Sequence, residues 1–196
     1  MKTPIRSPLR LGLTLLLLFN AANVAAFNAV ESDTETESVL ITSNTIGVDN
    51  LLDDRLYLYV EGDVRDAAML RVALTEAFAA EGVTTVPVDS LDGRFDAPVL
   101  AVFCDEVALE YSPIRSNSKV DWQLYYSATG NAAQLATLRA DNFAPIDLTD
   151  ADPYVSFGLF TTYDVTTGIF TLPSYRTHIT DEMAAEAVRN VEIAQA

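Results

Sequence analysis

The segment VLAVFC, residues 99–104, most constrains the fold of this chain, because it has no polar residue on either face. A strand of that kind is covered on both sides, whereas a strand with one wet face alternates apolar and polar residues. Such alternation begins directly afterwards, in residues 107–111, and returns in residues 120–126. The two segments, joined by the polar residues 112–119, therefore predict a long antiparallel hairpin, buried at its base and solvated at its tip.

The clearest helix begins after Asp63, which suits the N-cap position, and ends near Gly82. Its apolar residues recur at spacings of three and four, as on the buried side of a helix. A second amphipathic helix is predicted to begin at the cap residue Thr180, and residues 131–140 suit either a short helix or a loop. The other predicted strands are residues 39–48, 55–63, 83–88, 154–163 and 168–173, the last two forming a second hairpin.

Strands outnumber helices in this layout, and the helices are apolar on one side only. The sequence therefore predicts a single α+β domain over residues 39–196, in which a largely antiparallel sheet carries two amphipathic helices on one face. The element order over residues 55–128 resembles small exported domains of bacterial envelope-assembly lipoproteins, which have an anticodon-binding-like layout. The resemblance rests on element order, and the lipid-attachment cysteine of such lipoproteins is missing here, so it implies a layout and no site.

The first 26 residues have the order of a secretory signal peptide: a basic start, an apolar core at residues 11–19, and small residues up to Ala26. A membrane-spanning helix needs about 20 apolar residues. A cleaved signal peptide is therefore favoured over an N-terminal anchor, which would retain residues 11–27 in the membrane. Residues 27–38 are rich in Asp and Glu and are predicted to be an acidic spacer. We expect an exported protein, located outside the cell, at its surface or in the periplasm.

The charge of the chain limits its partners. Removal of residues 1–26 would leave 28 acidic residues against nine basic ones, a formal charge of −19. Such a surface repels nucleic acids, so no nucleic-acid partner is expected. Lysine is nearly absent, since Lys119 is the only lysine after the signal. An acidic, lysine-poor composition is typical of halophilic proteins, because high salt screens self-repulsion; an ordinary acidic secreted protein is the alternative.

Cys104 and His178 are the only cysteine and the only histidine. A nucleophilic thiol needs a neighbour that lowers its pKa, whereas Asp105 and Glu106, which directly follow the cysteine, would raise it. Packing at the end of an apolar strand is the favoured role for Cys104, and a solvent-facing position in a connection is the favoured role for His178. The two residues are nevertheless the catalytic candidates, because partners far apart in sequence meet in a fold.

A candidate metal site lies in the acidic connection at Asp147, Asp150 and Asp152, whose carboxylates suit a hard cation such as Ca²⁺. The EF-hand pattern is missing, and solvated loop carboxylates are the favoured interpretation in so acidic a chain. The sequence contains no G-x-S-x-G elbow and no phosphate-binding glycine loop. We therefore expect no cofactor, and the carboxylates are too numerous for a catalytic pair to be singled out.

Aromatic residues gather in the two predicted hairpins, and most of them are expected in the core. Any that are exposed would form a surface for a protein or glycan partner. The leading hypothesis is an exported, non-enzymatic domain with a binding or assembly role at the cell surface. The alternatives are a small exported hydrolase, using Cys104 and His178 or a carboxylate pair, and a membrane-anchored accessory domain. The aromatic residues are Trp122, Tyr125, Tyr126, Tyr154, Phe157, Phe160 and Tyr163.

Overall fold

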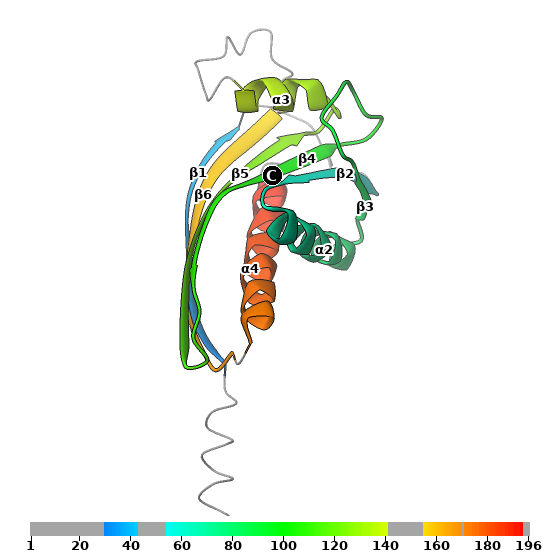
Figure 1. Ribbon diagram of the computed structural model, residues 1–196. Coiled ribbons are helices and arrows are strands. Elements are labelled where there is room, and N and C mark those ends of the chain that lie inside the picture. Colours follow the sequence, from blue (N-terminus) through cyan, green and yellow to red (C-terminus); the bar gives the residue numbers. More distant parts are fainter. Residues whose placement is uncertain (1–29, 43–53, 141–154, 170, 194–196) are drawn as a thin grey trace, which may run out of the picture.

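The computed structural model describes residues 30–42, 54–140, 155–169 and 171–193. These residues form one six-stranded sheet with three helices, which confirms the predicted α+β class (Figure 1). The strands are β1 (Glu31–Thr42), β2 (Arg55–Glu61), β3 (Thr84–Pro87), β4 (Val99–Glu110), β5 (Arg115–Ser127) and β6 (Val155–Thr167). The helices are α2 (Val64–Ala80), α3 (Ala132–Ala140) and α4 (Leu172–Ile193).

The sheet is mixed, with the strand order β1-β6-β5-β4-β2-β3. Strand β2 runs parallel to both of its neighbours, β3 and β4. Helix α2 carries the chain back between β2 and β3, which allows these two strands to be parallel. The pairings β4–β5, β5–β6 and β6–β1 are antiparallel. The hairpin of β4 and β5 was predicted from its alternation, and β3 lies at an edge, as its proline requires.

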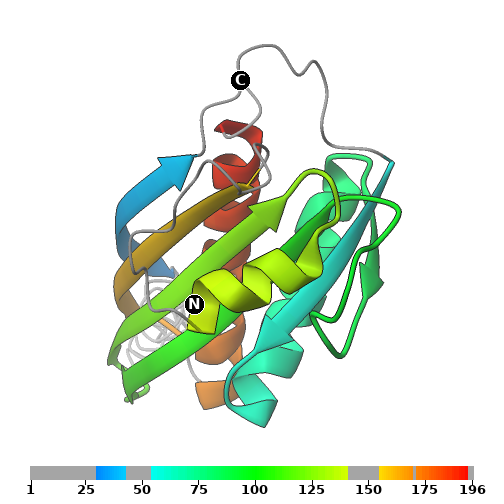
Figure 2. The ribbon, with the colours of Figure 1, turned by 90° about the horizontal axis from the view of Figure 1, so that it is seen from above.

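The helices cover the two faces of the sheet unequally. Helices α2 and α4 lie side by side on one face, called the inner face here, whereas α3 lies across one end of the opposite, outer face (Figures 1 and 2). The prediction of two helices on one face is therefore correct for α2 and α4. Residues 131–140, whose sequence suits either a helix or a loop, contain helix α3 (Ala132–Ala140), which covers the outer face.

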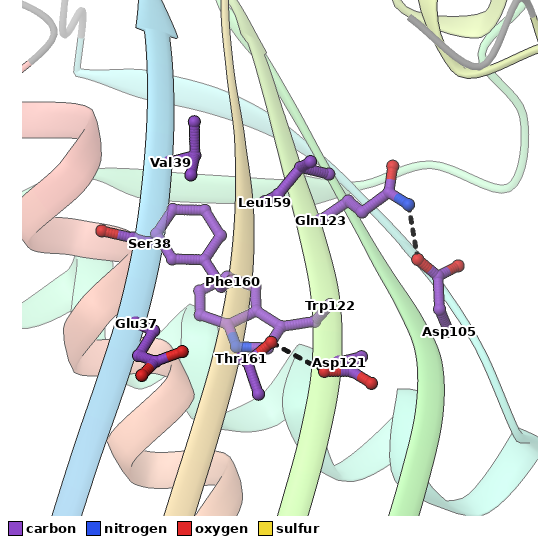
Figure 3. Close-up of a pocket in the computed structure, with 10 residues that line it drawn as sticks. All are labelled: Glu37, Ser38, Val39, Asp105, Asp121, Trp122, Gln123, Leu159, Phe160 and Thr161. Carbon is purple, nitrogen blue, oxygen red and sulfur yellow. Dashed lines mark hydrogen bonds between the residues drawn. The ribbon is translucent and has the colours of Figure 1, made fainter.

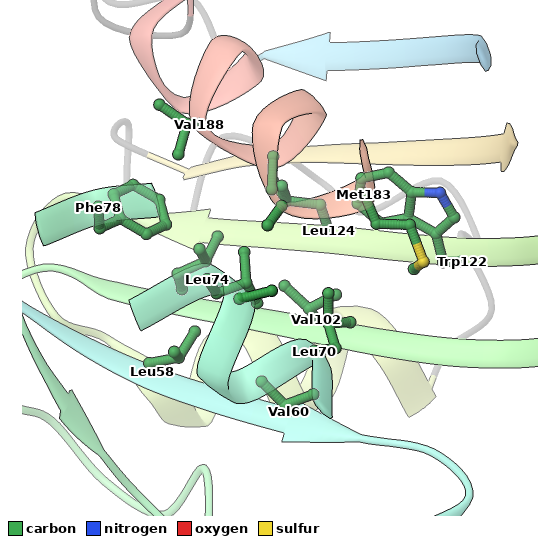
Figure 4. Close-up of a cluster of buried hydrophobic side chains, with 14 of the residues drawn as sticks. Leu58, Val60, Leu70, Leu74, Phe78, Val102, Trp122, Leu124, Met183 and Val188 are labelled. Atoms are coloured by element: carbon green, nitrogen blue, oxygen red, sulfur yellow. The ribbon is translucent and has the colours of Figure 1, made fainter. Parts of the chain in front are cut away.

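The two hydrophobic clusters explain why residues 99–104 lack polar side chains. On the inner face, Leu100 and Val102 join a cluster with α2 and α4 (Figure 4). On the outer face, Val99, Ala101 and Phe103 pack with the buried leucines of α3. Each fully buried large aliphatic side chain contributes about 1.5–3 kcal/mol to folding. The first half of β4 is thus the centre of the sheet.

Helix α2 begins and ends as its sequence predicts. The carboxylate of Asp63 accepts a hydrogen bond of 3.1 Å from the backbone N–H of Arg65, which caps the first turn. After the last turn, Gly82 has a φ of 83°, a left-handed conformation that glycine adopts without strain.

The acidic spacer predicted at residues 27–38 is wrong from Glu31 onward, because Glu31–Thr42 form strand β1 at the edge of the sheet. The segment alternates acidic residues with Ser and Thr, and the alternation is that of a strand. Its acidic side chains hid this period, because carboxylates are depleted in strands and common in spacers.

The predicted second hairpin, 154–163 with 168–173, is also wrong. Strand β6 runs without a break from Val155 to Thr167, and α4 begins at Leu172 instead of at Thr180. The true helix start is capped by Thr171, whose hydroxyl accepts a hydrogen bond of 3.2 Å from the N–H of Ser174. Thr180 lies inside the helix, where its hydroxyl donates to the carbonyl of Thr177. The predicted signal peptide lies outside the described residues.

Candidate functional site

The outer face of the sheet has an open half beyond α3, which we call the open outer face. It is formed by the outward-pointing residues of β1, β6, β5 and β4, which lie in register across the four strands. One row runs from Glu35 through Tyr163 to Lys119, and the next from Glu37 through Thr161 to Asp121. The helices α2 and α4 cover the other side of these strands, so this face is the exposed one (Figure 2).

A hollow of about 310 Å³ lies on this face (Figure 3), and Asp105 in its lining is paired with Arg139 of α3. Outward side chains of all four strands line it: Glu37, Val39, Asp105, Asp121, Gln123, Leu159 and Thr161. The hollow therefore combines carboxylates, an amide and a hydroxyl with aliphatic side chains. Such a mixture suits a ligand that offers both polar groups and an apolar surface.

The polar groups of the hollow are held in place by hydrogen bonds. Thr161 donates to one carboxylate oxygen of Asp121 over 2.8 Å, and Lys119 donates to the other over 2.7 Å. The bonds from Lys119 and Thr161 hold the pKa of Asp121 below its ordinary value. Nearby, Gln123 donates to Asp105 over 2.6 Å, and Arg139 of α3 forms an ion pair with Asp105. The lining is thus preorganised before any ligand arrives.

The apolar side chains of the open outer face are exposed although they lie in strands. Val39 is 59% exposed, Tyr163 41% and Leu159 38%. Leu159 and Val39 are cross-strand partners, so they form one continuous apolar patch. An apolar patch framed by polar groups is typical of an interaction surface.

The inner face of the same strands carries a buried carboxylate, Asp164. Its Oδ2 accepts hydrogen bonds of 2.8 Å from both Thr166 and Tyr175, and its Oδ1 accepts one of 2.8 Å from Thr34. Burial alone would raise the pKa of Asp164, but hydrogen bonds from His178, Thr166, Tyr175 and Thr34 hold it well below its usual range. The hydrogen bond to Asp164 in turn raises the pKa of His178, against the effect of burial.

Ser32, His178 and Asp164 contain the groups of a serine triad, but their geometry differs from one. In a triad, the carboxylate and the serine bind opposite nitrogens of the imidazole. Here Nε2 of His178 lies 2.9 Å from the Ser32 hydroxyl and 3.1 Å from Oδ1 of Asp164, so both use the same nitrogen. The Ser32 hydroxyl itself donates to Asp164 over 3.0 Å. This arrangement links β1, β6 and α4 and does not activate the serine.

Cys104 lies in β4 at the margin of the inner cluster, and its side chain faces α2 and α4. The thiol lines a small apolar space together with Leu70, Met183 and Arg176. Burial raises its pKa to about 12, and the carboxylates of Asp66 and Asp105 act in the same direction. The site of Cys104 therefore opposes thiolate formation. His178, the second catalytic candidate, lies inside α4 and contacts Asp164 and Ser32, so the solvent-facing position expected for it in a connection is wrong.

Cys104 also marks an irregularity in the sheet. The pairing of β4 with β5 shifts by one residue between Cys104 and Glu106, and Asp105 is the extra residue. The bulge lets Asp105 reach Gln123 and Arg139 at the hollow. A Cβ at Gly62 would come within 2.9 Å of the Cβ of Cys104, so the backbone packs tightly at this point.

The candidate metal ligands Asp147, Asp150 and Asp152 lie outside the described residues. Within residues 30–42, 54–140, 155–169 and 171–193, no group of three or more His, Cys, Asp or Glu side chains is placed to hold a metal ion. No helix in that part of the chain is both long and apolar enough to cross a lipid bilayer.

Tyr154 lies outside the described residues, and four of the six described aromatic candidates are buried, as expected. Trp122, Tyr125, Tyr126 and Phe160 are at most 3% exposed, and Trp122 stacks on Phe160 with ring centroids 4.2 Å apart. Tyr163 is the exposed one among the described aromatic candidates. The sequence does not identify the hollow, because its lining comes from four strands and one of these, β1, has the composition of a spacer. The alternation in residues 31–38 was the signal that would have revealed β1.

Comparisons with known proteins give likenesses to solved structures only. The chain matches no protein-family model and no curated protein sequence. It is similar to a PelC dodecamer structure from Paraburkholderia phytofirmans, with 10% identity over 83% of this chain and 99% of that chain and a TM-score of 0.44. It is also similar to a minor lipoprotein from Acinetobacter baumannii, with 16% identity over 70% of this chain and 91% of that chain and a TM-score of 0.34.

Proposed function

We propose that this protein is an exported, non-enzymatic domain that acts by binding or assembly at the cell surface, and that the open outer face is its binding surface. The observation that carries the proposal is the hollow on that face. Aliphatic side chains remain exposed there beside polar groups that are already fixed by hydrogen bonds. The order of the first 26 residues supports export.

The hydrolase alternative receives no support from its two named residues. A thiol whose pKa is raised to about 12 is almost fully protonated at neutral pH. We expect Cys104 in the native protein to react with a maleimide much more slowly than in urea-unfolded protein. Equal rates in the two states would contradict the buried role of Cys104 and revive the thiol as a nucleophile.

The experiment that tests the proposed function measures retention at the cell surface. Wild type and the double variant Leu159→Ser, Gln123→Ala are expressed in the source cells, and the fraction that remains with washed cells is quantified. We expect the wild type to be retained and the double variant to be released into the medium. Val72→Ser, at an exposed position on α2, is the matched control and should behave as wild type. Equal retention of the double variant and wild type would overturn the proposal.

Mass spectrometry of the native N-terminus separates this function from the membrane-anchored alternative. A chain that begins at Phe27 has lost its signal peptide, so its retention depends on the folded domain. A chain that still begins at residue 1 would be held by residues 11–27, and the accessory-domain alternative would replace the proposal.

A further inference from the structure

Strand β1 presents a regular row of carboxylates at the free edge of the sheet. It is the outermost strand, paired only with β6 among the described strands, and no described element lies beyond it (Figures 1 and 2). Its outward-pointing acidic side chains are Glu31, Asp33, Glu35 and Glu37, all exposed. The inward-pointing Ser32 and Thr34 are fixed to Asp164 by hydrogen bonds, so the strand is held in place before any partner arrives.

Exposed apolar residues accompany this acidic row along the neighbouring strand. Val165 is the cross-strand partner of Asp33, and Tyr163 is that of Glu35. They are 36% and 41% exposed. The described strands of the open outer face carry eight carboxylates and two cationic side chains, and one of the carboxylates, Asp105, is paired with Arg139 of α3. The carboxylates belong to Glu31, Asp33, Glu35, Glu37, Asp105, Glu106, Glu110 and Asp121, and the cations to Arg115 and Lys119.

The excess of carboxylates on the open outer face favours a cationic partner. The spacing of the carboxylates along β1 favours a partner in an extended conformation. Outward residues of a strand recur every second position, roughly 6.8 Å apart. A second extended chain presents its own alternate side chains at the same interval, whereas a turn of α-helix rises by roughly 5.4 Å and loses register. The backbone N–H and C=O groups that β1 turns away from β6 pair with no other described strand, and they offer such a chain the hydrogen bonds of a sheet ladder.

A second copy of this protein is a poor occupant of the edge. Pairing of β1 with another β1 would set carboxylates opposite carboxylates, and like charges directly opposite each other destabilise a sheet. The same row therefore prevents self-association through β1 and favours a chain of opposite charge.

We propose that the free edge of β1 binds an extended polypeptide segment with Lys or Arg at alternate positions, which adds to the sheet as a seventh strand. The inference rests on the proposed function, since it names the class of partner for the open outer face. The partner's cations lie beside Asp33 and Glu35, and its backbone pairs with β1.

The test uses a synthetic peptide in which Lys-Thr is repeated five times, with both ends blocked. Binding is measured by calorimetry on the full chain, and the contact is mapped by amide chemical shifts in NMR. We expect the largest shifts in residues 31–38. The double variant Asp33→Asn, Glu35→Gln should bind roughly tenfold more weakly, because two ion pairs are lost. A matched variant at the exposed residues Glu76 of α2 and Glu81 directly after it, Glu76→Gln with Glu81→Gln, should bind within about twofold of wild type.

Two further peptides separate strand addition from general attraction between opposite charges. One contains five lysines followed by five threonines, and the other has the alternating sequence with every second backbone nitrogen methylated. Both should bind several-fold more weakly than the alternating peptide, because register or backbone pairing is lost. Equal binding of all three, or equal weakening by the α2 variant, would overturn the proposal.

Failure of the edge proposal can be distinguished from failure of the proposed function, because the two experiments depend on different residues. The retention experiment depends on Leu159 and Gln123 in the hollow, whereas the peptide experiment depends on Asp33 and Glu35 at the edge. Loss of retention in the hollow variant together with absence of peptide binding would overturn the edge proposal alone.

Discussion

Strand β6 has two faces that reverse the usual pattern of a half-buried strand. Its inward residues at the open end of the sheet, Thr162, Asp164 and Thr166, are polar and at most 1% exposed. Its outward residues Tyr163 and Val165 are apolar and 41% and 36% exposed. Hydrogen bonds satisfy these inner polar groups: Thr166 donates to Asp164, and Thr162 accepts from the indole N–H of Trp122. The outer apolar groups have nothing described above them and are available for binding.

The largest loss of stability should follow removal of the buried charge of Asp164. Asp164→Asn replaces one acceptor oxygen with an amide that donates hydrogen bonds. It then faces the donors Thr166 and Tyr175 and leaves His178 without its counter-charge. We expect a loss of about 4 kcal/mol in the free energy of unfolding, measured by urea titration. Asp33→Asn, on the exposed side of the neighbouring strand, is the control and should change stability by less than about 0.5 kcal/mol. Equal effects would show that the two faces do not differ as described.

The substitution Tyr175→Phe should cause a smaller loss in the free energy of unfolding. The variant removes one buried hydroxyl that donates to Asp164 over 2.8 Å and leaves the ring in place. A hydrogen bond to a charged group is worth about 1.5–3 kcal/mol, so a loss of about 2 kcal/mol is expected in the same titration. If the variant matches wild type, the Asp164 carboxylate does not depend on this donor.

The pH dependence of stability should reveal the contribution of His178. Its raised pKa stabilises the fold below the ordinary value of 6.5, and this contribution is lost as the pH rises through the folded-state pKa. The lowered pKa of Asp164 stabilises the fold above 3.8 and is lost as the pH falls through its folded value. Asp181 and Glu182 also face the imidazole and raise its pKa.

The variant His178→Gln should therefore be less stable than wild type by about 1 kcal/mol between about pH 4 and 6.5. The difference should shrink at higher pH, as the wild-type imidazole loses its proton. Unfolding midpoints across this range measure it. A difference that grows above pH 7 would contradict the assignment of His178 as the cation that pairs with Asp164.

The smallest effect is expected on the outer face. Leu159→Ala should change the free energy of unfolding by about 0.5 kcal/mol, because the side chain is 38% exposed. Leu124→Ala, on the inner face of the adjacent strand and 1% exposed, should cost about 3 kcal/mol. Comparable losses in the two variants would mean that the open outer face is covered in the folded protein.

The sequence predicted those elements whose signals are local. The cap at Asp63, the alternation after Val107 and the proline of β3 each act through neighbouring residues, and each prediction was correct. The start of α4 was missed because Thr180 looks like a cap, although Thr171 and Pro173 offered an earlier one. The hollow and the buried Asp164 could not be predicted, since each depends on pairings between strands distant in sequence.

The position of β1 also determines the order in which the sheet can be completed. Ser32 and Thr166, which lie within hydrogen-bond distance across the β1–β6 pair, are 134 positions apart in the chain. Strand β1 must therefore wait for almost the whole chain before its only described partner strand exists, and pairings of such long range are slow to form. During that delay its carboxylates act as gatekeepers, because mutual repulsion keeps unpaired β1 strands of neighbouring chains from associating.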